Sequence, residues 1–202
     1  MIHWTMHYCQ RCETPVHLLP NGDHATCPIG HYNEPARRLP LFVVTGASGS
    51  GKSAVFPFLA AELQEYAVFD ADLLIDPFGL ACAPDPINWP AFRDAWLAVA
   101  HSVAQSGRAT VLLSPFMSEQ LEDLPARRWI SDIHFALLDC TDTTRTERLG
   151  NRPSWREHNP AQQLAFAKHL RTQIPTVLPT DNTTPTTTAL AIADWVRNLS
   201  RT

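Results

Sequence analysis

The chain has 202 residues, of which 45% are hydrophobic, and a formal net charge of −4 at pH 7. This length suits one α/β domain with a small appendage, and the apolar content is that of an ordinary globular core. No stretch approaches the ~18 consecutive apolar residues of a membrane span, and the first residues lack the pattern of a secretory signal. The net charge argues against a broad basic surface, so nucleic acid is not a favoured partner. The five cysteines show a metal-binding pattern and not a disulfide framework, so we expect a cytoplasmic protein.

Residues 1–38 carry a cluster of potential metal ligands. A Cys-x-x-Cys pair is followed after 14 residues by Cys-Pro-Ile-Gly-His. Such paired turns let a short chain surround tetrahedral Zn²⁺, and the segment has too little apolar material for a core of its own. The pattern predicts structural zinc held by Cys9, Cys12, Cys27 and His31. The module resembles a zinc ribbon, whose fourth ligand would fall at Gly30; His24 is the competing ligand, and a metal-free hairpin is the alternative.

The second predicted domain, residues 39–202, follows a linker at Arg37 to Pro40 and opens on an apolar strand, residues 41–44. The next eight residues fit the pattern G-x-x-x-x-G-K-[ST] at every fixed position. Glycines allow a tight turn whose N–H groups face phosphate oxygens, and the helix predicted over 53–64 adds its dipole. We therefore predict a nucleoside triphosphate site formed by Gly46, Ala47, Ser48, Gly49, Ser50, Gly51, Lys52 and Ser53.

Within this loop, Lys52 is predicted to reach the β- and γ-phosphates and Ser53 to hold Mg²⁺. A glycine-rich linker that fits the pattern by chance is the alternative. The chain contains only two lysines, Lys52 and Lys168, and the presence of one of them at this position argues against a chance match.

A second short apolar run, residues 66–69, ends in Asp70-Ala71-Asp72. It predicts a parallel strand that delivers two carboxylates to the sheet edge where open α/β sheets bind ligands. One carboxylate there can accept the proton of a hydroxyl that attacks a γ-phosphate, while the other supports Mg²⁺. The alternative for Asp72 is to cap a following helix.

Together, the glycine-rich loop and the Phe69–Asp72 stretch resemble the shikimate kinase, gluconate kinase and chloramphenicol phosphotransferase group of P-loop kinases. The resemblance implies a three-layer α/β sandwich with a five-stranded parallel sheet. It also implies ATP- and Mg²⁺-dependent transfer of the γ-phosphate to a hydroxyl of a small molecule, with Asp72 as the substrate-facing base and Asp70 near the magnesium. Ser114 departs from the pattern, because an acidic residue normally ends the strand predicted over 109–116. The chain also lacks the glycine cluster that shikimate kinases carry at this strand end, and both departures argue against shikimate as the acceptor.

Further strands are predicted over 134–139 and 176–178, and helices over 89–105 and 186–199, from their apolar spacing. In the related kinases the region before and within the first of these helices covers the acceptor. The pocket candidates there are Phe78, Trp89 and Arg93, with core packing as the alternative for the aromatic residues.

Arginines spaced three and four apart lie on a short helix, residues 143–149 with Asp142 as the predicted cap, and just beyond it. By the same resemblance, a lid around residues 142–160 closes on the triphosphate, and Arg148 and Arg152 stabilise the transferring group. For Arg145 and Arg156 a solvated basic face fits equally well. A further helix is predicted to begin at Asn159-Pro160.

Two other functions stay open at this stage. The chain could phosphorylate the 5′-hydroxyl of a polynucleotide, although it shows no basic, aromatic-lined groove. It could also be a nucleotide-responsive module that binds a protein partner through its zinc segment.

Overall fold

The computed structural model describes residues 8–14, 16–75, 88–153 and 159–201. Its centre is a five-stranded sheet in which every neighbouring pair is parallel, with the strand order β5-β6-β4-β7-β8. The strands are β4 (Leu41–Thr45), β5 (Ala67–Asp70), β6 (Thr110–Ser114), β7 (Ile133–Asp139) and β8 (Val177–Pro179). All five predicted strands are present, and the predicted parallel sheet is confirmed.

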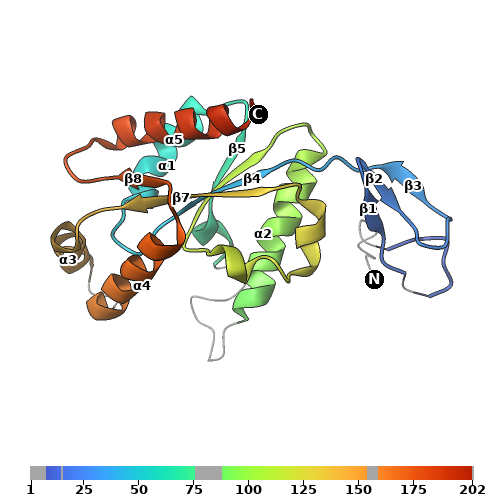
Figure 1. Ribbon diagram of the computed structural model, residues 1–202, viewed down its shortest axis with the longest axis horizontal. Helices are drawn as coiled ribbons and strands as arrows, with labels where there is room; N and C mark the ends of the chain where they lie inside the picture. Colours follow the sequence, from blue (N-terminus) through green and yellow to red (C-terminus); the bar gives the residue numbers. More distant parts are fainter. Residues whose placement is uncertain (1–7, 15, 76–87, 154–158, 202) are drawn as a thin grey trace.

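Helices cover both faces of the sheet, which gives the three layers seen in Figure 1. They are α1 (Lys52–Glu62), α2 (Trp89–Ala104), α3 (Asp142–Gly150), α4 (Pro160–Gln173) and α5 (Pro185–Leu199). Side chains of β4 alternate between the layers: Leu41 and Val43 pack with α2, whereas Phe42 and Val44 pack with α1 and α5. No helix in the described part of the chain is long and apolar enough to cross a membrane.

The N-terminal cap of α4 is the residue expected from the sequence, whereas the cap of α3 is a different one. Asn159 caps α4 as predicted, since its side chain accepts a hydrogen bond from the Gln162 amide at 3.2 Å. The predicted cap of α3 was wrong: Thr141, not Asp142, accepts from the Thr144 amide. The Asp181 carboxylate anchors the amide and hydroxyl of Thr141, which therefore precedes the helix and leaves Asp142 in its first turn.

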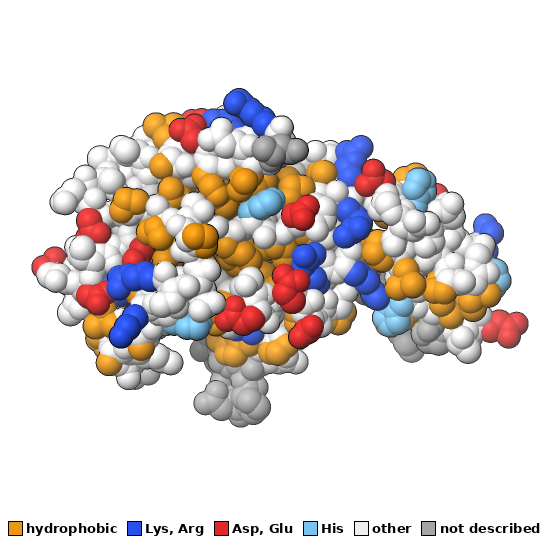
Figure 2. Space-filling view, viewed as in Figure 1, with side chains coloured by type: hydrophobic (Ala, Val, Ile, Leu, Met, Phe, Trp, Pro, Cys, Tyr) orange, Lys and Arg blue, Asp and Glu red, His pale blue; other side chains and the backbone are white. Residues whose placement is uncertain are grey.

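The N-terminal module is a small antiparallel sheet of β1 (Leu19–Asn21), β2 (His24–Thr26) and β3 (Asn33–Pro35). Its apolar cluster includes Trp129 from the body, which is fully buried. The linker is also tied to the body: the Arg37 amide donates to Gln105, and the Arg38 guanidinium donates to the Ile130 carbonyl, both at 3.0 Å. Figure 2 shows basic side chains along this boundary. The module therefore packs against the body and shares a core residue with it.

Candidate active site

The glycine-rich loop joins β4 to α1 at the carboxyl end of the sheet. Gly46 approaches the neighbouring strand so closely that a Cβ there would lie 2.5 Å from the Leu138 carbonyl oxygen. Gly51 precedes α1 with φ +100°, a left-handed conformation that favours glycine. Both positions therefore need glycine for geometric reasons, and together they place the N-terminus of α1 at the sheet edge, where it attracts anions.

This loop forms one wall of a cavity of about 390 Å³. The cavity brings together the residues predicted for phosphate, magnesium, base and lid. Its lining consists of Ser48, Gly49, Ser50, Gly51, Lys52, Ser53, Ala54, Asp70, Asp72, Pro115, Arg148, Arg152, Gln163 and Phe166. Gly46 and Ala47 form the buried start of the same loop.

The two aspartates take different positions beside the cavity. Asp70 ends β5, with one carboxylate oxygen 3.4 Å from the Ser53 hydroxyl and the other accepting the Asp72 amide at 3.1 Å. Asp70 therefore caps the 3₁₀ turn Ala71–Leu74, the role considered for Asp72. Asp72 lies in that turn, exposed, with the cavity beside it. The hydroxyl and carboxylate of Ser53 and Asp70 are oxygen donors of the kind that Mg²⁺ prefers.

The Lys52 ammonium lies at the loop and donates to the Gly46 carbonyl at 2.5 Å and towards the Ala47 carbonyl at 3.4 Å. Burial lowers its pKa to about 8, although the nearby Asp70 and Asp72 carboxylates raise it. A phosphate group would compensate this desolvation, because the charged ammonium would gain an anionic partner.

We expect the affinity for Mg·ATP to fall as the pH rises through about 8, the pKa of Lys52. Below this pH the ammonium is already charged in the free protein, whereas above it binding must take up a proton. In Lys52→Arg the pH dependence should disappear, because a guanidinium stays protonated to about pH 12 or above. Calorimetric titrations from about pH 7 to about pH 9.5 would measure this. Equal pH dependence in both proteins would contradict the assignment of Lys52.

The predicted lid residues separate in the structure. Arg148 donates to the Gly49 carbonyl at 3.1 Å and to the Thr180 hydroxyl at 2.9 Å. Arg152 lies in the cavity lining with Arg148. Arg145 is fully buried on the other side of the loop, so it does not face the cavity in this structure. Arg156 lies outside the described residues.

Two of the acceptor-pocket candidates, Trp89 and Arg93, do not line the described part of this cavity. Trp89 is 40% exposed and packs edge-on against Phe92. The Arg93 guanidinium lies 5.8 Å from the centre of the Phe116 ring. Neither is among the described residues that line the cavity, and Phe78 lies outside the described part of the chain. At the end of β6, Ser114 is buried and its hydroxyl accepts from the Phe116 amide, so it stabilises the turn there.

Sequence reasoning missed two features of the site. Gln163, in the first turn of α4, accepts a hydrogen bond from the Ser48 amide at 3.0 Å. A second cavity of about 220 Å³ shares Gly51, Ala54 and Arg148 with the first and extends to Thr180 and the start of α5. The one local signal for Gln163 was its place just after a strong helix start, which says nothing about what its side chain contacts.

The predicted zinc ligands come together in the N-terminal module. The donor atoms of Cys9, Cys12, Cys27 and His31 all lie within 4.8 Å of one another. Cys12 Sγ is 3.6 Å from Cys27 Sγ and 3.3 Å from His31 Nδ1. A tetrahedral site with Zn–S bonds of ~2.3 Å has edges of about 3.8 Å, so the donor set fits zinc. His24, the competing ligand, lies in β2 and is not part of this cluster.

No protein-family model matches the chain, and a search of curated proteins finds no match. Several solved structures are similar to this chain. The tunicamycin resistance protein of Deinococcus radiodurans is 21% identical, with 79% of this chain and 96% of that chain covered and a TM-score of 0.59. A sugar kinase from a Janibacter species is 21% identical, with 81% of this chain and 95% of that chain covered and a TM-score of 0.56. Shikimate kinase from Acinetobacter baumannii is 18% identical, with 79% of this chain and 94% of that chain covered and a TM-score of 0.52.

These similarities show the fold. The chain has the fold of these solved structures, and this fold is the three-layer α/β sandwich that the resemblance implied. The identities leave the reaction and the substrate to be argued from the site itself.

Proposed function

We propose that this protein is an ATP- and Mg²⁺-dependent phosphotransferase that moves the γ-phosphate to a hydroxyl of a small molecule. The main support for this proposal is that Lys52, the Ser53–Asp70 pair and Asp72 all line one cavity beside the glycine-rich loop. A loop suited to phosphate, a pair of oxygen donors for magnesium and a second carboxylate, that of Asp72, line one cavity, and these are the parts that phosphoryl transfer requires.

Each group would have a distinct task. The loop amides and Lys52 bind the phosphates, and Arg148 and Arg152 stabilise the charge that develops on the transferring group. Ser53 and Asp70 would hold Mg²⁺, which neutralises phosphate charge when bound. Asp72 orients the acceptor hydroxyl and takes its proton as the oxygen attacks phosphorus. We place the nucleoside part of ATP in the second cavity, because it joins the phosphate cavity at Gly51 and Arg148.

We also propose that the N-terminal cluster binds one Zn²⁺ with a structural role. Four protein ligands would fill a tetrahedral site and leave no position for substrate. The geometry supports this proposal, because the four donor atoms all lie within 4.8 Å of one another.

The function can be tested by Mg·ATP-dependent ADP release in the presence of pooled acceptors. The pools would contain nucleosides, nucleotides, sugars, aminoglycoside and phenicol antibiotics, and 5′-hydroxyl oligonucleotides. We expect one small-molecule pool to stimulate release by wild type and by Lys168→Ala, which changes the chain's other lysine on the exposed side of α4. Lys52→Ala should abolish the stimulation. Stimulation by oligonucleotides alone would instead identify a polynucleotide kinase, and tight ATP binding with no stimulation would contradict the proposal.

A further inference from the structure

Arg145 is a buried charged residue that the proposed reaction does not use directly. It lies in α3 beneath the glycine-rich loop and is 0% exposed. Burial of a guanidinium is costly unless its donors are paired. One terminal nitrogen pairs with the Asp139 carboxylate, and the other donates to the Ser48 carbonyl at 2.7 Å. Arg145 therefore connects the end of β7 to the loop that would bind phosphate.

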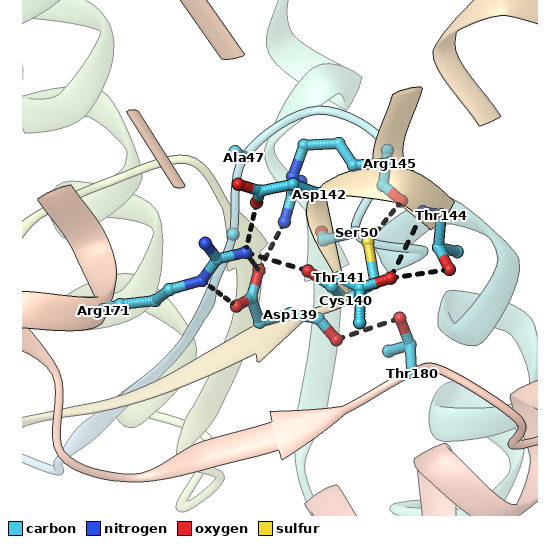
Figure 3. A network of polar contacts seen from close by, with 12 residues as sticks. Ala47, Ser50, Asp139, Cys140, Thr141, Asp142, Thr144, Arg145, Arg171 and Thr180 are labelled. Carbon is cyan, nitrogen blue, oxygen red and sulfur yellow. Dashed lines mark hydrogen bonds and ion pairs between the residues drawn. The ribbon is translucent and has the colours of Figure 1, made fainter. Parts of the chain in front are cut away.

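Asp139 is itself fixed by a second cation (Figure 3). Arg171, from α4, approaches the other carboxylate oxygen of Asp139 at 2.5 Å and also pairs with Asp142 at 2.9 Å. The Asp139 backbone carbonyl accepts from both the amide and the hydroxyl of Thr180. A single carboxylate thus holds arginines from two helices at the end of a central strand, so the guanidinium of Arg145 has little freedom to move.

The contact with the loop fixes the direction of its peptide groups. The carbonyl and N–H of one peptide bond point in opposite directions, so the hold on the Ser48 carbonyl turns the next amide, that of Gly49, away from Arg145. Gly49 also fits closely over this side chain, since a Cβ there would lie 3.2 Å from Arg145 Cγ. Arg148 holds the Gly49 carbonyl in a similar way. Two loop carbonyls are thus bound by arginines. The Ser48 amide is paired with Gln163 and the Ser50 amide with the Ala47 carbonyl, so the Gly49 amide is the one that the hold on Ser48 directs towards a possible anion.

We propose that Arg145 is a positioning residue that, together with Asp139, holds the glycine-rich loop in its phosphate-binding conformation before nucleotide arrives. The effect on ATP affinity rests on the proposed function, whereas the effect on loop order does not. Arg145 would thus act from underneath the loop and not in the lid considered for it from the sequence.

Amide hydrogen exchange of the full-length protein without nucleotide tests the loop directly. Arg145→Met keeps the apolar stem but removes both polar contacts, and Arg145→Lys keeps the charge but cannot make both contacts at once. Arg197→Met is the matched control, because it removes half-exposed ion pairs with Glu62, at the opposite end of α1 from the loop, and with Glu65. We expect exchange in residues 46–51 to rise about tenfold in Arg145→Met and less in Arg145→Lys, with no change in the control.

Mg·ATP affinity, measured by calorimetry well below each variant's unfolding temperature, should weaken about tenfold in Arg145→Met and less in Arg145→Lys. Unchanged exchange in the loop, or an equal rise across the whole sheet, would overturn the positioning role. Should Arg145→Met fail to fold, Arg145→Lys and Asp139→Asn must still show the selective rise, and its absence would overturn the inference. If wild type fails to bind Mg·ATP, the proposed function fails, while the exchange data still decide whether Arg145 orders the loop.

Discussion

Replacement of Asp72 by Asn should lower turnover by about 10²- to 10⁴-fold and leave the affinity for Mg·ATP nearly unchanged. The Asn side chain has a similar size, so the cavity keeps its shape, but it cannot take the proton of the attacking hydroxyl. Asp72 lies beyond the loop that would hold the phosphates, in the 3₁₀ turn capped by Asp70. We therefore expect nucleotide binding to depend mainly on the loop, Lys52 and Ser53.

The measurement is steady-state ADP release with the acceptor pool that stimulates wild type, together with calorimetric titration of Mg·ATP. Asp194→Asn, which changes an exposed carboxylate on α5, serves as the control for the loss of one negative charge. Equal turnover by wild type and Asp72→Asn would exclude Asp72 as the base. It would favour instead a nucleotide-responsive module without catalysis. A loss of ATP binding in Asp72→Asn would show that this carboxylate shapes the nucleotide site.

Removal of zinc should unfold the N-terminal module and expose Trp129 while the sheet of the body persists. The module's core includes two of the candidate ligands, Cys9 and Cys27, so the metal and the apolar cluster stabilise the same small structure. Zinc binding contributes ~10–16 kcal/mol to the folding of small zinc modules, far more than an apolar cluster of this size could replace. Trp129 packs into that cluster and stacks on His101 of the body, with ring centres 5.0 Å apart.

We expect one zinc per chain by elemental analysis and a red shift of tryptophan emission on chelation. The shift should be smaller in Trp129→Phe, since the chain has six tryptophans. His31→Ala should weaken zinc binding by about 10²-fold or more, as it removes one of four ligands. His24→Ala is the matched control and should bind zinc as wild type does. Zinc retained in His31→Ala but lost in His24→Ala would reverse the assignment of the fourth ligand.

Local patterns in the sequence determined most of the architecture. The strand before the glycine-rich loop, the loop itself and the start of α4 at Asn159 each depend on residues within a few positions of one another. Their geometry is therefore set by backbone sterics, capping and short-range apolar alternation. The Cys and His spacing of the N-terminal module is local in the same sense, and its four donors meet in the structure as the spacing predicted.

Tertiary structure decided which side chains meet across the sequence. Arg145 and Ser48 are 97 positions apart, and α3 packs beneath the loop in a way that no helical spacing reveals. The same holds for Gln163 at the Ser48 amide and for Trp129 in the core of the N-terminal module. Spacing places a residue on a face of its own helix, but the partner of that face depends on how the layers pack. For this reason the sequence predicted the glycine-rich loop, and only the folded structure showed which distant side chains contact it.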